Sequence, residues 1–315
     1  MLTKARVPRF PGILGIMLVC ISAASIFGAA RPHGVATPHR RTPANVRVMT
    51  ARKTYLGFDR NNYPGDAALP ALRKTFSFCG YWLNTPPSAI SDTWLGERRQ
   101  LLHSGFGFLV LFNGRKYADI QDRDPQALGR TDGEAAAAAA HREGFPRGAI
   151  IFLDQEEGGR LLAAQRIYVL AWMDALTVGG YRPGIYCSGM PAIEESSGGS
   201  ITTANNLREN SGGRKISFWV YNTAAPPSPG CVFPPTAPQP AAGGVPFAAV
   251  WQFAQSPAPA GLAGTRGYAP DGTCYAPGVP RAARIHIDVE SANSPDPSRG
   301  RGLPSAHQTS HAAQR

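Results

Sequence analysis

The sequence lacks the signatures of several large classes of protein. It has no clustered stripe of Lys and Arg and no helix-turn-helix pattern, so we do not expect nucleic acid as a partner. No Gly-Lys-Ser or Gly-Lys-Thr follows Gly158-Gly159, which excludes a P-loop. Ser188 has no Gly-x-Ser-x-Gly context, which argues against a serine hydrolase. His103, His141 and His286 lack metal-ligand spacing, so neither a metal ion nor another cofactor is expected.

Acidic residues are scarce, and none lies in residues 1–30, whereas Lys4, Arg6 and Arg9 do. An apolar stretch of about 17 residues follows, near the lower limit for a membrane span. Gly28-Ala-Ala30 then supplies the small residues that suit signal peptidase. We therefore predict a signal peptide over residues 1–30 and a secreted or periplasmic protein. The alternative is an uncleaved signal anchor, which would be the one membrane contact.

The formal net charge of the chain is +11. Such a surplus favours anionic partners, among them cell-wall polymers and membrane surfaces. The charge says nothing about the fold, which we infer from the pattern of apolar residues.

Cysteine is scarce as well, with five residues in the chain, and Cys20 would be removed with the signal peptide. An even number then remains, which permits disulfides in an exported chain. Cys231 and Cys274 both lie in loops rich in Pro and Gly, and we predict that they form a disulfide. Cys79 and Cys187 lie in strand-like runs, so we predict that these two are buried free thiols.

Composition divides the chain into four segments. After the signal peptide, we predict a flexible leader at 31–53, a barrel domain at 54–292 and a disordered basic tail at 293–315. The barrel segment contains eight strand-like apolar runs, at residues 55–59, 76–83, 106–112, 149–156, 181–187, 216–221, 247–253 and 284–289. Helical patterns lie between the earlier runs, at residues 66–75, 95–103, 132–143, 160–178 and 200–209.

Apolar strands separated by helices predict an α/β fold with a parallel sheet that is covered on both faces. Eight such units over roughly 240 residues match an irregular (β/α)8 barrel of the TIM type in a single domain. The alternative is a doubly wound open sheet. That fold would carry a Gly-rich phosphate turn after an early strand, and Gly57-Phe-Asp59 is not one. We expect the protein to be a monomer.

Acidic residues close several of the predicted strands. Asp59 ends the first, Asp154 and Glu156 end the fourth, and Asp288 ends the eighth. Alternate residues of a strand share a face, so Asp154 and Glu156 point the same way. In a barrel the carboxyl ends of the strands meet at one mouth, and the first and last strands are neighbours, which places Asp59 beside Asp288. Two carboxylates that bracket one bond are typical of glycoside hydrolysis.

Aromatic residues lie near the same strand ends. Sugar rings present apolar C–H faces, and flat aromatic side chains offer matching surfaces. We therefore expect five residues to contact a substrate: Tyr186, Trp219, Tyr221, Trp251 and Gln252. For Tyr186 and Trp219, a purely structural place in the core is the alternative.

The order of these motifs resembles the glycoside hydrolase family 25 lysozymes, whose irregular β/α barrel cleaves peptidoglycan. The segments that carry the resemblance are Gly57-Phe-Asp59, Asp154-Gln-Glu156, Gly184-Ile-Tyr-Cys-Ser188, Trp219-Val-Tyr221, Trp251-Gln252 and Ile287-Asp288. Over roughly residues 54–292 the chain is also similar to the related glycoside-hydrolase-like domain of unknown function 1906. That similarity adds two segments, Gly80-Tyr-Trp-Leu83 and Gly144-Phe-Pro-Arg-Gly148.

The resemblance implies a role for each acid. Glu156 matches the general acid of the lysozymes, and Asp154 matches the companion carboxylate that assists the intermediate or the acetamido group of the substrate. Asp59 and Asp288 match supporting acids at the rim. The expected function is hydrolysis of peptidoglycan or a related N-acetylated glycan. The alternative is a non-catalytic barrel module that binds wall glycan. The long Pro-rich insertion at 224–246 departs from the lysozymes and bears on the substrate.

Overall fold

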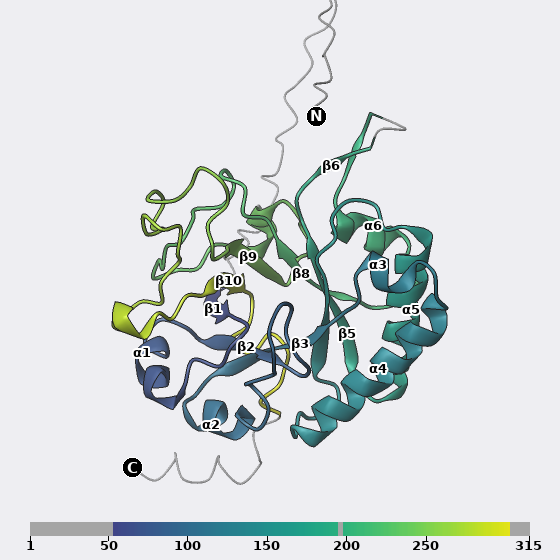
Figure 1. The fold of residues 1–315 in the computed structure, drawn as a ribbon, viewed down its shortest axis with the longest axis horizontal. Coiled ribbons are helices and arrows are strands. Elements are labelled where there is room, and N and C mark those ends of the chain that lie inside the picture. Colours follow the sequence, from purple (N-terminus) through teal and green to yellow (C-terminus); the bar gives the residue numbers. More distant parts are fainter. Residues whose placement is uncertain (1–52, 195–197, 303–315) are drawn as a thin grey trace, which may run out of the picture. The chain divides into compact units, whose positions relative to one another are not determined.

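The computed structural model describes residues 53–194 and 198–302, so the predicted signal peptide and most of the predicted leader lie outside the described residues. Eight strands close into a barrel in the order β1-β10-β9-β8-β5-β4-β3-β2 (Figure 1). They are β1 (Tyr55–Asp59), β2 (Phe78–Trp82), β3 (Gly107–Asn113), β4 (Ile150–Gln155), β5 (Arg182–Ser188), β8 (Ser217–Tyr221), β9 (Val250–Ala254) and β10 (Asp288–Ala292). The predicted barrel is confirmed.

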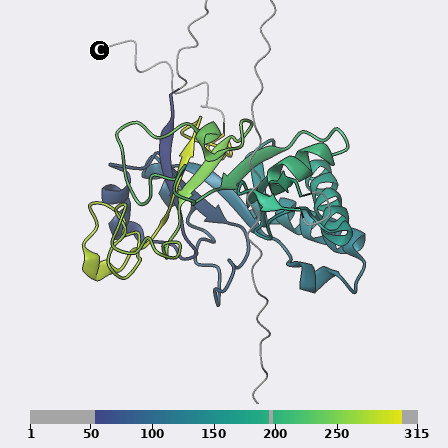
Figure 2. The same ribbon diagram turned by 90° about the horizontal axis from the view of Figure 1, so that it is seen from above.

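Helices cover the first part of the barrel, and loops replace them later. The helices are α1 (Leu69–Leu72), α2 (Arg98–His103), α3 (Tyr117–Ile120), α4 (Pro125–Arg142), α5 (Ala163–Val178) and α6 (Thr203–Glu209). The strands β6 (Ala192–Ile193) and β7 (Ser200–Ile201) form a small separate hairpin. Short 3-10 turns are η1 (Asp66–Ala68), η2 (Pro240–Gly243) and η3 (Arg281–Ala283). Figure 2 shows α4, α5 and α6 on one side of the barrel and the long connections after β8 and β9 on the other. In the described ranges no helix is long and apolar enough to cross a bilayer.

The longest helix, α4, lies close against α5 because its contact face is built from small residues. Its first turn is capped by the Asp124 side chain, which accepts hydrogen bonds from the next backbone N–H groups. A methyl group on Gly129 would lie 2.3 Å from the carbonyl oxygen of Tyr168, and one on Gly133 would lie 2.5 Å from that of Trp172. Further along the helix, Ala136, Ala137, Ala139 and Ala140 are also buried.

The last strand, β10, runs opposite to the other seven. It pairs antiparallel with both β1 and β9, and Asp288 is the register partner of Asp59. The sequence predicted a parallel strand that ends at Asp288, and this was wrong, since the strand begins there. Residues 255–287 contain no α-helix that could carry the chain back to the far end of the barrel, so the chain re-enters from the mouth. Asp288 therefore still lies at the mouth, beside Asp59.

Residues after β10 close the opposite end of the barrel. Asp296 Oδ1 accepts a hydrogen bond from Phe108 N–H at 2.9 Å, and Ser298 O accepts one from Ile150 N–H at 2.8 Å. Arg98 Nη2 donates to Gly300 O at 2.7 Å. The sequence predicted a disordered tail from residue 293, whereas residues 293–302 make these ordered contacts at the amino ends of β3 and β4. The rest of that segment lies outside the described residues.

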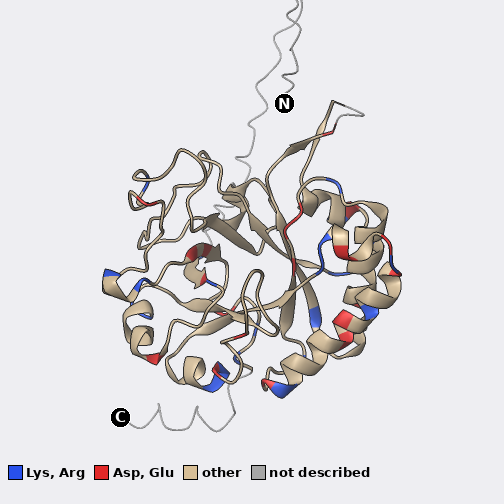
Figure 3. Cartoon of the chain, viewed as in Figure 1, with Lys and Arg blue, Asp and Glu red and all other residues tan. Residues whose placement is uncertain are grey.

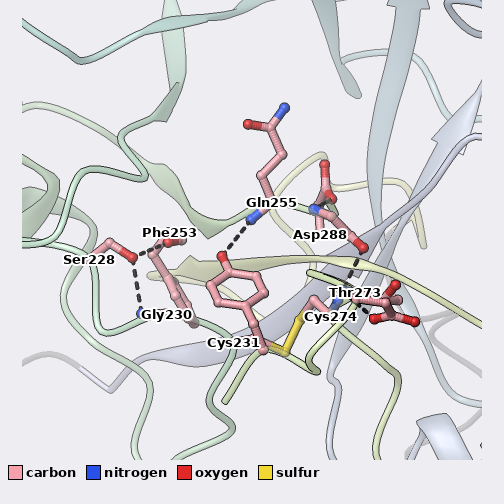
Figure 4. Close-up of a disulfide and its surroundings, with 11 residues drawn as sticks. Ser228, Gly230, Cys231, Phe253, Gln255, Thr273, Cys274 and Asp288 are labelled. Carbon is pink, nitrogen blue, oxygen red and sulfur yellow. Dashed lines mark hydrogen bonds between the residues drawn. A yellow bond between two sulfur atoms is a disulfide. The ribbon is translucent and has the colours of Figure 1, made fainter. Parts of the chain in front are cut away.

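The disulfide between Cys231 and Cys274 joins the two long connections after β8 and β9 (Figure 4). This confirms the predicted pairing. Cys79 and Cys187 are buried free thiols, as expected. Each lies within a barrel strand, where burial raises the pKa of its thiol and disfavours the reactive thiolate.

Candidate active site

A pocket of about 280 Å³ opens at the carboxyl ends of the parallel strands. Most of the predicted site residues come together in its lining: Asp59, Asp154, Glu156, Tyr186, Trp219, Gln252 and Asp288. Figure 3 shows acidic positions in the centre of the barrel face, where β1 and β10 lie. Gly80 makes room for one of them, because a methyl group there would lie 2.6 Å from Asp59 Cβ. The pocket is thus lined by several carboxylates with aromatic rings beside them.

Asp154 and Glu156 lie at the junction of this pocket with a second hollow of about 220 Å³. Both residues line both hollows. Asp154 is at the end of β4 and only 7% exposed, whereas Glu156 lies just beyond the strand and is exposed. The turn is held in place by the Tyr221 hydroxyl, which donates to Glu156 O at 2.8 Å. A chain-like ligand that occupied both hollows would therefore pass over the two carboxylates.

The second hollow has a further charged group, Lys116, whose positive charge acts to lower the pKa of Asp154. Arg115 also lines this hollow but forms a two-point ion pair with Asp132, at 2.6 and 2.8 Å. Glu157 also lines it and accepts hydrogen bonds from Tyr117 N–H and from Gln165 Nε2. These contacts fix the wall of the hollow, so Lys116, Asp154 and Glu156 are the charged residues of its lining that remain to contact a ligand.

Burial sets the protonation of the acids on the pocket floor. It raises the pKa of Asp154 well above its usual value, and the negative charges of Glu156 and Asp59 raise it further. Burial also raises the pKa of Asp59 to about 6. The pKa of Asp288 is raised well above its usual range by burial and then by the charge of Asp59. The floor therefore holds protons that free carboxyl groups would lose near pH 4.

Gln252 links the acids of β1 and β10. Its Nε2 donates to Asp288 Oδ2 at 2.7 Å and approaches Asp59 Oδ1 at 3.4 Å. Its Oε1 accepts a hydrogen bond from the Tyr186 hydroxyl. Ser256 N–H donates to the other oxygen of Asp288 at 2.6 Å. Gln252 was predicted as a substrate contact, and its amide also orients both carboxylates.

One acid of the site escaped the sequence analysis. Glu290 lies two residues after Asp288 on β10, so both point to the same face, and it is completely buried. Burial and the charge of Asp59 raise the pKa of Glu290 well above its usual value. The alternation Asp288-Val-Glu290 was a visible signal, but it has meaning only once the strand is known to begin at Asp288.

The aromatic residues divide into two groups. Tyr186 and Trp219 line the pocket wall, with ring centroids 4.4 Å apart. Tyr221 lines neither hollow and acts through its bond to Glu156. Trp251 lies on the outer face of β9, because its neighbour Gln252 faces inward and alternate residues of a strand point to opposite faces. Trp251 Nε1 donates to a backbone oxygen outside the pocket, so the predicted substrate contact does not agree with its position.

Eleven further residues line the pocket without having been predicted as site residues, among them Arg60, Trp82 and His286. Arg60 directly follows Asp59, so its position after a strand end was a usable signal. Within the described ranges, no group of three or more His, Cys, Asp or Glu side chains is arranged to hold a metal ion.

Comparison with known proteins finds several solved structures of similar fold and one matching family model. Among solved structures, an uncharacterized B. stearothermophilus protein is 20% identical, with a TM-score of 0.48 over 76% of this chain and 95% of that one. The Tat-secreted protein Rv2525c of Mycobacterium tuberculosis is 13% identical, with a TM-score of 0.45 over 77% and 96%. A bacterial lysozyme from Streptomyces coelicolor is 16% identical, with a TM-score of 0.42 over 79% and 96%. No curated protein matches the sequence. Residues 81–227 match the family model described as Rv2525c-like, glycoside hydrolase-like domain.

Proposed function

We propose that the protein hydrolyses glycosidic bonds of peptidoglycan or of a related N-acetylated glycan. The observation that carries the proposal is the position of Asp154 and Glu156 at the junction of two adjoining hollows. Sugar units in the two hollows would place the bond between them over this pair. Two carboxylates beside one glycosidic bond supply the acid and the charge stabilisation that its cleavage needs.

Each acid has a distinct part in the proposed reaction. Glu156, exposed at the junction, donates its proton to the glycosidic oxygen as the bond from that oxygen to the anomeric carbon breaks. Asp154, buried beneath it with a raised pKa, orients the acetamido group through hydrogen bonds, and in its ionised form stabilises the positive charge that develops on the sugar. Water then adds to the anomeric carbon and returns a proton to the carboxylate. Asp59 and Asp288 support the pocket floor through Gln252.

The test is the release of reducing ends from purified sacculi. The Glu156→Gln and Asp154→Asn variants should each lose about 100-fold or more in rate, while circular dichroism shows an unchanged fold. Glu134→Gln serves as a matched control, since Glu134 is exposed on α4 and lines neither hollow. Wild-type rates in the Glu156→Gln variant would remove this residue from the mechanism. Binding to sacculi with no released ends would instead assign the barrel to a glycan-binding module.

We also propose that the protein is exported and acts as a monomer on the cell envelope. The basic and apolar pattern of residues 1–30 supports export, and the disulfide between Cys231 and Cys274 is of the kind that persists in oxidising compartments. Amino-terminal sequencing of the protein from culture medium or periplasm tests this. An intact amino terminus in a membrane fraction would favour the uncleaved anchor.

A further inference from the structure

Arg60 adds an unpaired positive charge to the wall of an otherwise acidic pocket. It follows β1 directly and lines the 280 Å³ pocket. Its Nε is buried and has no hydrogen-bond partner among the described residues. Three ion pairs occur in the described ranges, and Arg60 takes part in none: they are Arg115–Asp132, Arg160–Glu194 and Arg214–Asp174. A buried donor without a partner is costly, and a ligand that accepts its hydrogen bond would remove that cost.

The backbone around Arg60 is held firmly. Trp82 Nε1 donates to Arg60 O at 3.2 Å, and Trp94 Nε1 donates to Asn61 O at 3.0 Å. The Asn61 side chain in turn donates to Pro87 O at 2.8 Å. Two buried indoles thus fix the backbone of the turn after β1, and this places the Arg60 side chain at the edge of the pocket.

One neighbouring acid, Asp288, is already engaged elsewhere. Both oxygens of Asp288 accept hydrogen bonds, from Gln252 and from Ser256 N–H. His286 lines the pocket near Arg60, and its pKa is lowered by burial and then by the charge of Arg60. A neutral imidazole adds no positive charge. Arg60 is therefore the cationic group of this pocket wall that remains available to a ligand.

We propose that Arg60 binds a carboxylate of the sugar unit that occupies this pocket and so makes the barrel selective for an anionic glycan. The proposal rests on the proposed function in that it takes the pocket as a glycan site. A planar guanidinium matches a carboxylate in a two-point hydrogen bond. A singly charged carboxylate fits better than a doubly charged phosphate, because the negative charge of Glu156, which lines the same pocket, repels a doubly charged group more strongly. Without residues 1–30, which hold Lys4, Arg6 and Arg9 and no acid, the net charge is +8, and this would favour the encounter with an anionic polymer.

The experiment compares the binding of two tetrasaccharides to the full chain by calorimetry, in a Glu156→Gln background that prevents turnover. One is chitotetraose, which is N-acetylated and neutral. The other alternates N-acetylglucosamine with N-acetylmuramic acid and carries free lactyl carboxylates. Arg60→Gln should weaken binding of the carboxylated sugar about 10- to 100-fold, as expected for lost charge-assisted hydrogen bonds, and leave chitotetraose within about twofold. Arg60→Lys keeps the charge, so its affinity for the carboxylated sugar should lie between that of the wild-type residue and that of Arg60→Gln.

Arg284→Gln is the matched control. Arg284 is exposed and close to His286 but does not line the pocket, so this variant removes the same charge from outside the site. It should change the affinity for either tetrasaccharide by no more than about twofold. Equal losses for both sugars in Arg60→Gln, or an equal effect of Arg284→Gln, would overturn the proposal. So would the failure of both sugars to bind before Arg60 is changed. Stronger competition by glucose 6-phosphate than by glucuronate would overturn the choice of carboxylate. Because binding is measured without turnover, the result is independent of whether sacculi release reducing ends.

Discussion

Removing the disulfide between Cys231 and Cys274 should lower the free energy of unfolding by up to about 4 kcal/mol. The two cysteines are 43 residues apart in the sequence. In the entropic account of disulfides, closing a loop of this length in the unfolded chain costs about 13 cal/mol/K, which is about 4 kcal/mol at 25 °C. This is an upper value, because a compact unfolded chain has less freedom to lose.

Loss of the disulfide should also weaken the contacts that position the pocket residues. Cys274 N–H donates to Ser256 Oγ at 3.1 Å, and Ser256 N–H donates to Asp288 Oδ1 at 2.6 Å. On the other side of the disulfide, Gly230 N–H donates to Ser228 Oγ at 3.0 Å, and that hydroxyl donates to Phe253 O on β9 (Figure 4). The disulfide therefore holds both long connections close to the strands that carry Gln252 and Asp288.

The assay is urea unfolding followed by tryptophan fluorescence, for the wild-type chain and for the Cys231→Ala/Cys274→Ala double variant. The double variant should unfold at lower urea, and a reductant should shift the wild type toward it while leaving the variant unchanged. Glycan affinity should fall in the variant at urea-free conditions. A stability difference below about 1 kcal/mol, or two freely alkylated cysteines in the unreduced protein, would refute the reasoning.

Three further predictions follow from the pocket and its surroundings. Between pH 4 and 6 the free energy of unfolding should fall as the pH rises, because native Asp59, with a pKa of about 6, keeps a proton that the unfolded chain has lost. If denaturation curves of Asp59→Asn gave the same dependence of the free energy of unfolding on pH as the wild type, this would contradict the prediction. Gly80→Ala should destabilise the protein by about 1–3 kcal/mol and displace Asp59, whereas Gly158→Ala, with its nearest neighbour 3.6 Å away, should be tolerated in the same melts. Trp251→Ala should lower stability by about 3–5 kcal/mol through the lost packing, with glycan affinity of the folded protein unchanged in calorimetry; a selective loss of affinity would place the ring in the binding site after all.

The sequence by itself determined the elements and the order of the acids. Strand-like runs such as 106–112 and 149–156 are continuous apolar segments, and hydrophobic pattern is a local property that needs no tertiary information. Asp154 and Glu156 follow such a run, so their place at a strand end could be predicted. The pairing of Cys231 with Cys274 was also predictable, because few cysteines remained and only these two lay in irregular segments.

The tertiary structure alone decided the direction of β10, the side on which Trp251 lies, and the burial of Glu290. Strand direction depends on the path of residues 255–287, whose irregular sequence carries no periodic signal. Which side chain faces the pocket depends on register, and a shift of one residue sends every side chain to the opposite face. The raised pKa of Asp154 and the unpaired guanidinium of Arg60 depend on neighbours drawn from strands far apart in the chain, and only the closed barrel brings those neighbours together.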